Sequence, residues 1–362
     1  MSKLGIIFGG RSEEHEVSVL SAASIVKAVA GTKYEPVPIG INREGRWFPI
    51  EESMEGIETL DDPRVRTLIP RGSGDSRRAF DPGSLLAPLD FAFPVLHGPY
   101  GEDGRIQGLF EMLDLPYGGC GVAASAVAMD KIFTRELWLR AGLPVCRHTT
   151  LRRRGYAADP AGERARAERA LGFPIFVKPA NLGSSVGIGK ARSADALEAA
   201  IERAFLYDDR LILEECVDCR ELEIGVLGNE EPAVSAVGEI VPEAEFYDYD
   251  SKYRGGATKL FIPADISPET AARIAALARR AYAALNAEGF ARIDFFLDRR
   301  SGAVLLNEIN TIPGFTAYSM FPSLWREAGV AYDVLIERII GLGYERYYAK
   351  NNRESDNAQR RR

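Results

Sequence analysis

The sequence predicts a three-domain protein of the α/β and α+β classes, with a parallel sheet in its N-terminal domain. Three observations support this prediction. The chain has 362 residues, which is more than a single hydrophobic core usually accommodates. It opens with a strand, a glycine turn and a helix, the order of a βαβ unit. Its middle third then runs strand, loop, strand, helix and strand, which is typical of a small α+β domain.

The first domain is expected over residues 1–128. Alternating apolar segments and turn residues predict strand 4–8, helix 16–29, strand 34–39, strand 91–96 and helix 106–113. Residues 42–85 are polar and rich in Gly, Pro and Arg, so we expect an irregular insertion there.

The second domain is expected over residues 129–217 and the third over residues 218–349. The elements predicted for them are helix 131–141, strand 174–178, helix 195–205, strand 211–215, strand 222–227, helix 268–285, strand 291–297 and strand 303–307. Residues 350–362 are polar and basic, and we expect them to form a disordered tail.

Composition excludes several classes of protein. Hydrophobic residues make up 46% and charged residues 27% of the chain, which excludes wholesale disorder and collagen-like repeats. A net charge of -7 leaves no electrostatic footprint for nucleic-acid binding. We find no signal peptide and no membrane span, and therefore expect a cytoplasmic protein.

The chain has four cysteines, too few for a disulfide scaffold. Cys216 and Cys219 form a single CxxC pair without nearby histidines, because the only histidines are His15, His97 and His148. We therefore favour two reduced thiols over a zinc or redox site.

Two pairs of polar residues stand two positions apart on apolar segments: Arg292 with Asp294, and Glu308 with Asn310. Alternate residues share one face of a strand, so the four side chains meet if the two strands pair. Carboxylate and amide oxygens are hard ligands that suit Mg²⁺ and leave room for phosphate. A surface salt bridge is the plainer interpretation, but charges on a buried sheet need a partner, and we favour the metal site.

The loop 178–189 combines Lys178 with small residues. Small residues let backbone N–H groups approach phosphate oxygens, and the lysine supplies positive charge. The spacing matches neither the Walker A loop nor the dinucleotide fingerprint, because Ser184 and Arg192 stand where those motifs need glycine. A plain hairpin turn is equally compatible with this segment.

Three further segments carry reactive or charged side chains. Residues 9–16 join a strand to a helix, where acidic residues either complement the helix dipole or bind an ammonium group. Residues 245–253 are aromatic and charged, and form either a lid or a surface segment. His97 ends a buried strand among glycines, which indicates close approach of the backbone to another group, although a lone histidine is more often structural.

Taken together, these segments resemble the D-alanine–D-alanine ligase family of the ATP-grasp superfamily. The resemblance extends from about Lys3 to Leu342 and covers nearly the whole chain. It rests on seven motifs in the family's order: GGRSEEHEVS (9–18), HGPYGEDGRIQG (97–108), MDK (129–131), VKPANLGSSVGIGK (177–190), EFYDYDSKY (245–253), ARIDFF (291–296) and LNEINTIPGFTAYSMFP (306–322).

The resemblance implies an ATP-grasp architecture in which ATP lies between the second and third domains with two Mg²⁺ or Mn²⁺ ions. Asp294, Glu308 and Asn310 match the metal ligands. The residues that match nucleotide-binding positions are Lys131, Lys178, Gly183, Ser184, Ser185, Gly187, Glu214, Glu221, Phe246, Lys252 and Asn307.

The resemblance also assigns residues to the substrates. Glu14 matches the carboxylate that binds the first ammonium group, and Arg292 with the Gly314 N–H matches the oxyanion site. Ser319 and Met320 match contacts to the second substrate. The substrate-binding residues also include His97, and a lid-closing trio consists of Glu14, Ser184 and Tyr253.

The implied reaction joins two D-alanines to D-alanyl-D-alanine through a D-alanyl phosphate, releases ADP and phosphate, and serves peptidoglycan precursor synthesis. In this family a tyrosine at the position of Tyr253 accompanies formation of the dipeptide rather than D-alanyl-D-lactate. We expect a homodimer and leave dependence on a monovalent cation open. The alternatives are a ligase for another amino acid, a nucleotide-binding regulator without turnover, and a dinucleotide oxidoreductase, which the missing fingerprint disfavours.

Overall fold

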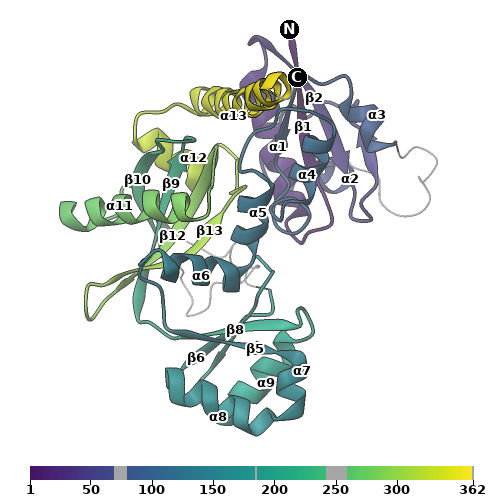
Figure 1. Cartoon of the computed structure of the whole chain (residues 1–362). Helices are drawn as coiled ribbons and strands as arrows, with labels where there is room; N and C mark the ends of the chain where they lie inside the picture. The colour runs from purple at the N-terminus through teal and green to yellow at the C-terminus, as the bar shows by residue number, and fades with distance from the viewer. Residues whose placement is uncertain (69–79, 184–185, 242–258, 361–362) are drawn as a thin grey trace.

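A computed structural model of the chain has three sheets, which lie in three separate parts of the molecule (Figure 1). It describes residues 1–362 except 69–79, 184–185, 242–258 and 361–362. Within the described residues, no helix is both long and apolar enough to span a bilayer.

The N-terminal sheet has the strand order β3-β2-β1-β4. Strands β2 (Tyr34–Ile41) and β4 (Phe91–Pro94) both run parallel to β1 (Ser2–Gly9), as predicted. The edge strand β3 (Trp47–Pro49) runs antiparallel to β2, so the sheet is mixed rather than parallel throughout. A tight turn at residues 42–46 reverses the chain, because Asn42 Oδ1 accepts hydrogen bonds from the Glu44 and Arg46 N–H groups.

The insertion expected to be irregular over residues 42–85 contains regular elements besides β3. Helix α2 (Pro63–Thr67) and helix α3 (Pro82–Leu86) each begin with proline after an aspartate. Asp62 and Asp81 accept hydrogen bonds from the first helical turn in each case. The two Asp-Pro pairs are therefore helix-start signals.

Two helices of the N-terminal part pack against its sheet. Helix α1 (His15–Val29) follows β1, and its apolar side packs on the sheet in one core with Leu4, Ile6 and Phe8. Helix α4 (Arg105–Met112) follows the His97 loop and packs through Ile106 and Phe110 into a second cluster.

The central sheet is antiparallel, with the strand order β5-β8-β6-β7. Its strands are β5 (His148–Arg152), β6 (Ile175–Pro179), β7 (Gly189–Ala191) and β8 (Arg210–Glu215). Three helices, α7 (Arg153–Ala158), α8 (Pro160–Leu171) and α9 (Ala194–Ala204), cover one side of the sheet at the lower end of the molecule in Figure 1. This sheet and its helices share a core of their own.

The C-terminal sheet is antiparallel, with the strand order β11-β10-β9-β12-β13. Its strands are β9 (Cys219–Leu227), β10 (Ala233–Val241), β11 (Lys259–Phe261), β12 (Phe290–Asp298) and β13 (Val304–Asn310). Helix α11 (Pro268–Ala284) packs on the face that carries Leu222 and Ile224. Helix α12 (Met320–Glu327) packs on the opposite face, beside Gly225 and Gly238.

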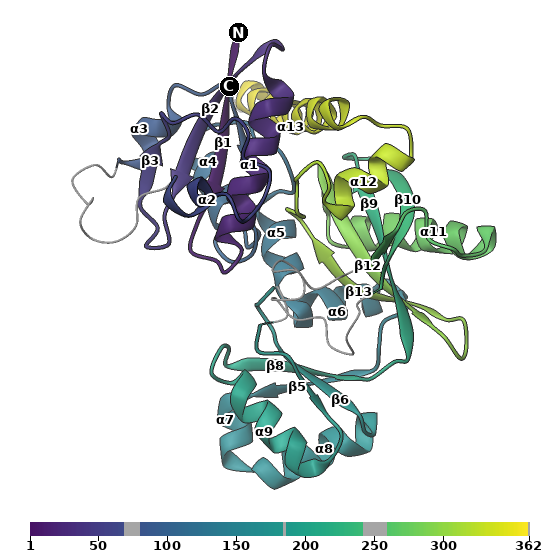
Figure 2. The same cartoon turned by 180° about the vertical axis from the view of Figure 1, so that it is seen from behind.

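Helices α5 (Val122–Met129) and α6 (Lys131–Arg140) connect the N-terminal part to the central sheet (Figure 2). Their apolar residues belong to the core of the C-terminal sheet, and Trp138 Nε1 donates a hydrogen bond to the Ala281 carbonyl of α11. We predicted that residues 129–217 form the central domain. The first helix of that segment, α6, packs on the C-terminal sheet.

The last helix, α13 (Tyr332–Arg360), returns to the N-terminal sheet. Its Leu335 and Ile339 share a core with β1, and Tyr344 packs on Phe91 with ring centroids 4.9 Å apart. The helix continues through residues 350–360, where we expected a disordered tail. Ala, Arg, Glu, Gln and Lys in this segment are good helix formers, and α13 supplies a helix that they extend.

Candidate active site

The polar residues of β12 and β13 face each other as expected, because the two strands are antiparallel neighbours. Arg292 pairs with Asn310, and Asp294 pairs with Glu308. The Arg292 guanidinium binds both carboxylate oxygens of Asp294, through Nε to Oδ1 at 2.7 Å and NH2 to Oδ2 at 2.8 Å. Asn310 Nδ2 donates a further hydrogen bond of 3.1 Å to Asp294 Oδ2.

Glu223 extends this cluster from the neighbouring strand β9. It pairs with Asp294 in register, is buried, and lies 2.9 Å from Arg292 Nε through its Oε2 atom. Burial alone would lower the pKa of Arg292, but the carboxylates of Asp294 and Glu223 raise it well above its ordinary value. The guanidinium therefore stays charged in its buried position.

The cluster fits a hard divalent cation. Asp294, Glu308 and Asn310 present two carboxylates and an amide on paired strands, and Mg²⁺ takes few protein ligands where phosphate and water supply the rest. Within the described part of the chain, no three His, Cys, Asp or Glu side chains are arranged to hold a metal ion by themselves. The donor set thus suits a metal that arrives with a phosphorylated ligand.

A second charged cluster joins the central sheet to α6. The buried Glu214 carboxylate accepts hydrogen bonds from Lys178 Nζ at 2.5 Å and from Arg135 Nε at 2.9 Å. Burial alone would raise the pKa of Glu214, but Arg135 and Lys178 hold it well below its ordinary range.

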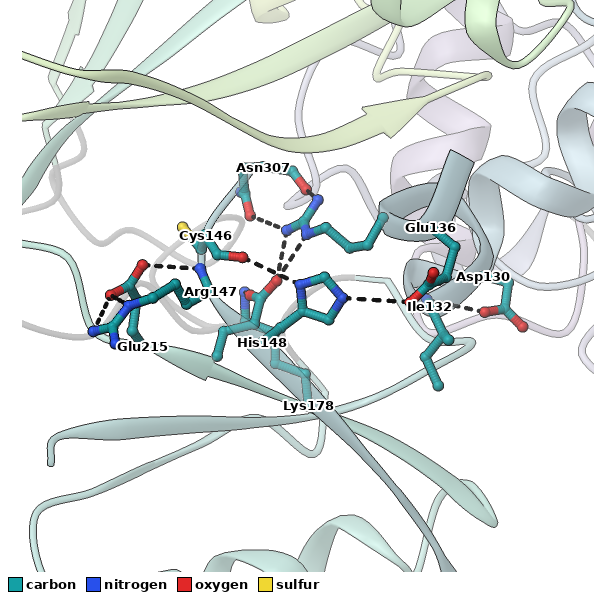
Figure 3. A network of polar contacts seen from close by, with 11 residues as sticks. Asp130, Ile132, Glu136, Cys146, Arg147, His148, Lys178, Glu215 and Asn307 are labelled. Atoms are coloured by element: carbon teal, nitrogen blue, oxygen red, sulfur yellow. Dashed lines mark hydrogen bonds and ion pairs between the residues drawn. The ribbon is translucent and has the colours of Figure 1, made fainter. Parts of the chain in front are cut away.

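Arg135 also links this cluster to the C-terminal sheet, because its NH1 group donates a hydrogen bond to the Asn307 carbonyl. Asn307 stands at a register shift between the β12 and β13 pairings, where one residue of β13 has no counterpart. Figure 3 shows the polar network around Lys178 and Asn307. The bulge thus turns a backbone carbonyl toward α6.

Lys131, the first residue of α6, lies close to the loop that follows β6. Its ammonium group donates a hydrogen bond to the Leu182 carbonyl, and its N–H donates one to Ala180. Burial lowers the pKa of Lys131 below its ordinary value, an effect that Glu308 opposes and Lys178 reinforces. Lys131, Lys178 and the Glu308 carboxylate of β13 are therefore close enough to influence one another.

The predicted glycine loop is only partly described. Gly183 accepts a hydrogen bond from the Val186 N–H, and Gly187 has a φ of +73°, which favours glycine. Ser184 and Ser185, between them, lie outside the described residues. Phe246, Lys252 and Tyr253 also lie outside the described residues. Their predicted roles stay predictions.

The N-terminal part contributes the loop that begins at His97. Glu14 Oε2 is 3.2 Å from the position that a Cβ on Gly98 would occupy, and 3.9 Å from the corresponding position on Gly183. Glu14 therefore stands between the His97 loop and the glycine loop of the central domain.

His97 is buried, and both its ring nitrogens have partners. Nδ1 is 2.8 Å from the Ile312 carbonyl, and Nε2 is 3.1 Å from Ser21 Oγ. Burial lowers the pKa of His97, so the ring is neutral at neutral pH. A direct bond from His97 to a substrate would require one of these two bonds to break.

Gly314 and Ser319 are neighbours at the start of α12. Ser319 Oγ lies 3.2 Å from the position of a Cβ on Gly314, and 2.8 Å from Thr316 Oγ1. In the described part of the chain, the Gly314 N–H has no hydrogen-bond acceptor. The Met320 side chain packs instead with Ile240 and Leu324, so only its backbone N–H, in the first turn of α12, faces the helix N-terminus.

Sequence reasoning missed four residues of this arrangement: Ser21, Glu102, Arg135 and Glu223. Glu223 had a signal, since it shares a face of β9 with Glu221, which is itself a predicted nucleotide-binding residue. Arg135 had no such signal in the sequence. Arginine is common in helices, and only its buried partner Glu214 shows that it belongs to the site. Glu102 lies within the quoted motif 97–108, yet its individual contacts were not predicted.

Comparison with known proteins identifies the family. The family model described as D-ala D-ala ligase N-terminus matches residues 3–120, and that described as D-ala D-ala ligase C-terminus matches residues 137–341. A D-alanine–D-alanine ligase from Chloroherpeton thalassium is 45% identical over 363 residues, which cover 97% of this chain and 99% of that protein. The chain belongs to the D-alanine–D-alanine ligase family. The family predicted from the motifs is thereby confirmed.

Other members of the ligase family agree in sequence and in structure. The D-alanine–D-alanine ligase from Geobacillus kaustophilus is 46% identical over 356 residues, 96% of each chain. The D-alanine–D-alanine ligase from Coxiella burnetii has a TM-score of 0.82 at 33% identity and covers 100% of this chain and 99% of its own. VanG D-Ala:D-Ser ligase from Enterococcus faecalis has a TM-score of 0.80 at 35% identity, over 94% of this chain and 99% of that one. The ATP-grasp fold class is thus confirmed.

Proposed function

We propose that this chain ligates two D-alanines to D-alanyl-D-alanine at the expense of ATP, releasing ADP and phosphate, for peptidoglycan precursor synthesis. The observation that supports it most strongly is the family match over both halves of the chain. The arrangement of Arg292, Asp294, Glu308 and Asn310 is consistent with it, because paired strands bring an arginine and three oxygen ligands to one patch.

The chemistry requires an activated carboxylate. A free carboxylate repels an amine and has no good leaving group, so ATP must first convert it to an acyl phosphate. Enzymes of this kind act mainly by positioning reactants and neutralising charge. Two Mg²⁺ ions held by Asp294, Glu308 and Asn310 would supply charge neutralisation when bound.

The residues of the chain then have distinct tasks. Lys131 and Lys178 bind the phosphates, with Glu214 and Arg135 holding Lys178 in place. Glu14 binds the first ammonium group. Arg292, whose charge its buried neighbours preserve, stabilises the oxyanion of the tetrahedral intermediate.

The second oxyanion donor is the Gly314 N–H, and the second substrate binds nearby. The Ser319 hydroxyl and the Met320 N–H lie at the N-terminus of α12, where partial positive charge favours a carboxylate. This places the attacking amine beside the acyl group, since Gly314 and Ser319 are neighbours.

Phosphate release from ATP in the presence of D-alanine tests the proposal. We expect release that depends on both D-alanine and Mg²⁺, and D-alanyl-D-alanine as the product in mass spectrometry. Release that does not depend on D-alanine would contradict it. A larger yield of D-alanyl-D-lactate or D-alanyl-D-serine than of the dipeptide, with both amine and hydroxyl substrates present at neutral pH, would contradict the assignment of the second substrate.

We also propose that the protein is a homodimer in the cytoplasm. The support is the family resemblance and the dependence on cytoplasmic ATP. Light scattering of the purified protein tests the dimer, with a molar mass near twice 39.7 kDa expected.

A further inference from the structure

The backbone of Ile312, two residues before Gly314, is held on both sides by the N-terminal loop 97–102. Its N–H donates a hydrogen bond of 2.8 Å to Glu102 Oε1. Its carbonyl accepts one of 2.8 Å from His97 Nδ1. The other Glu102 oxygen accepts a hydrogen bond of 2.8 Å from the Gly98 N–H. A single carboxylate therefore joins the N-terminal loop to the segment that carries Gly314.

The residue after Gly314 is fixed from the same domain. The Phe315 N–H donates a hydrogen bond of 3.2 Å to Ser21 Oγ in α1, and Ser21 Oγ lies 3.1 Å from His97 Nε2. A carbonyl only accepts, so the His97 proton is on Nδ1, and Ser21 must donate its own proton to Nε2. The Phe315 carbonyl accepts from Tyr332 at 2.6 Å. Gly314 is thus anchored on both sides.

The anchoring loop is itself rigidly built. The Gly98 carbonyl accepts hydrogen bonds from the N–H groups of Gly101 and Glu102, which close a tight turn. A Cβ on Gly101 would come 1.8 Å from the Leu96 carbonyl oxygen, so only glycine fits there. Gln107 Nε2 donates a buried hydrogen bond of 2.7 Å to the Gly101 carbonyl. The turn therefore holds the Glu102 carboxylate in one place.

We propose that Glu102, together with Ser21 and His97, is a positioning residue that sets the direction of the Gly314 N–H. The proposal rests on the oxyanion role of Gly314 given above. None of the three residues needs to touch a reacting atom, because each acts through the backbone of Ile312 or Phe315. The N-terminal domain then completes the oxyanion site of the C-terminal domain, in addition to binding the first substrate.

Loss of this anchor should change the direction of the Gly314 N–H more than the affinity for ATP. An oxyanion donor stabilises the transition state only when its N–H points at the developing charge. A displacement of about 1 Å from a change outside the reacting groups can cost about 10²-fold in rate. The proposed ATP-binding lysines, Lys131 and Lys178, bond to Leu182 and Glu214 and not to the segment 312–315, so loss of the anchor should leave the affinity for ATP unaltered.

Measured at pH 8.5, where Glu102 is mostly ionised, Glu102→Gln is the sharpest variant, because an amide keeps the size of the side chain but offers one acceptor where two N–H groups need one each. We expect kcat to fall about 10²-fold while KM for ATP stays within about twofold. Ser21→Ala removes the acceptor for the Phe315 N–H and the donor to His97 Nε2, but leaves both bonds to Ile312 in place, and should give a smaller fall of the same kind. Glu111→Gln is the matched control, since Glu111 lies in the same domain and its side chain bonds to Tyr117 and Lys350, away from the segment 312–315.

Amide hydrogen exchange of the peptide 311–316 gives a readout that does not require turnover. We expect faster exchange of the Ile312 amide in Glu102→Gln and of the Phe315 amide in Ser21→Ala, with no change in Glu111→Gln. If Glu102→Gln fails to fold, Ser21→Ala carries both measurements.

Faster exchange together with a lower kcat and an unchanged KM for ATP would support the proposal. Unchanged exchange, or an unchanged kcat in an active enzyme, would overturn it. A wild-type protein that releases no phosphate with D-alanine would overturn the proposed function, and with it the oxyanion role on which the positioning depends, while the exchange data would still report whether the loop is anchored.

Discussion

The Glu214 carboxylate lies 2.5 Å from the ammonium group of Lys178 in the interior of the protein. The same carboxylate also binds Arg135, so one buried anion balances two buried cations. The net excess of positive charge suits a site for an anionic ligand such as the phosphates of ATP. Under the proposed function, this local concentration of cations explains how a chain with a net charge of -7 binds ATP.

Glu214→Gln should destabilise the protein and weaken ATP binding. The amide leaves two buried cations without their anion, a loss of about 3–5 kcal/mol in the free energy of unfolding for a buried pair. Thermal unfolding with and without ATP measures both effects. Glu215→Gln is the matched control, because Glu215 pairs with the exposed Arg147 and such a pair contributes about 0–1 kcal/mol. Equal losses of unfolding free energy in the two variants would show that the buried pair contributes no more to stability than the exposed pair.

Arg292→Lys should lower kcat by about 10²–10³-fold with little change in melting temperature. Lysine keeps the positive charge between Glu223 and Asp294 but cannot reproduce the two parallel hydrogen bonds of the guanidinium. Steady-state phosphate release gives kcat. Arg299→Lys, at an exposed pair with Asp218, is the control and should keep full activity. Activity near wild type in Arg292→Lys would exclude a directional role for the guanidinium.

ATP should raise the melting temperature of the protein, and Mg²⁺ should increase that rise. Glu308→Gln should abolish the increase that Mg²⁺ causes. A ligand that binds only the folded protein raises the melting temperature, and the rise grows with the logarithm of the ligand concentration relative to its dissociation constant. We therefore compare the shift produced by ATP alone with that produced by ATP and Mg²⁺. The wild type and the control Glu327→Gln, an exposed residue of α12, should show a larger shift with Mg²⁺. The same magnesium increment in Glu308→Gln would remove this residue from the metal ligands.

Glu102 should make stability depend on pH in an unusual direction. Burial, followed by the charge of Glu14, raises the pKa of Glu102 to about 8, while the Ile312 and Gly98 N–H groups and Arg292 lower it. Between its ordinary value near 4.5 and about 8, the folded state therefore binds more protons than the unfolded state. Stability from this group is complete at low pH and is lost as the pH rises toward 8.

The measurement is the difference in melting temperature between wild type and Glu102→Gln from pH 5 to pH 8.5. The stability of the wild type relative to the variant should fall as the pH rises, because glutamine does not titrate. Glu14, Arg292 and Cys120, which interact electrostatically with Glu102, are present in both proteins. A difference that stays constant over this range would show that Glu102 is ionised throughout.

Most of the elements could be predicted from the sequence, but their partners could not. The alternation of Leu222 and Ile224 with polar residues marked β9, and the apolar stripe of α11 marked that helix. No local pattern could indicate that Trp138 in α6 packs under α11, or that α13 returns to the first sheet. Those contacts join residues more than a hundred positions apart, and periodicity carries no information about them.

The residues of the candidate site also fall into those that the sequence could predict and those that it could not. Arg292 and Asp294 could be predicted to meet Glu308 and Asn310, because strand periodicity and a hairpin bring them together. Arg135 could not, since its significance comes from Glu214 on another sheet. Met320 was predicted as a residue but not by group: its side chain packs with Ile240 and Leu324, and its backbone N–H lies in the first turn of α12.

The return of α13 to the first sheet has a consequence for biosynthesis. Leu335 and Ile339 complete the core that Leu4 and Ile6 begin, so the strand that opens this core waits for residues translated much later. A nascent chain halted before residue 332 would expose the apolar surface of β1 and α1. Translation must therefore pass Ile339 before the first domain can close, and chaperones have that long an interval in which to act.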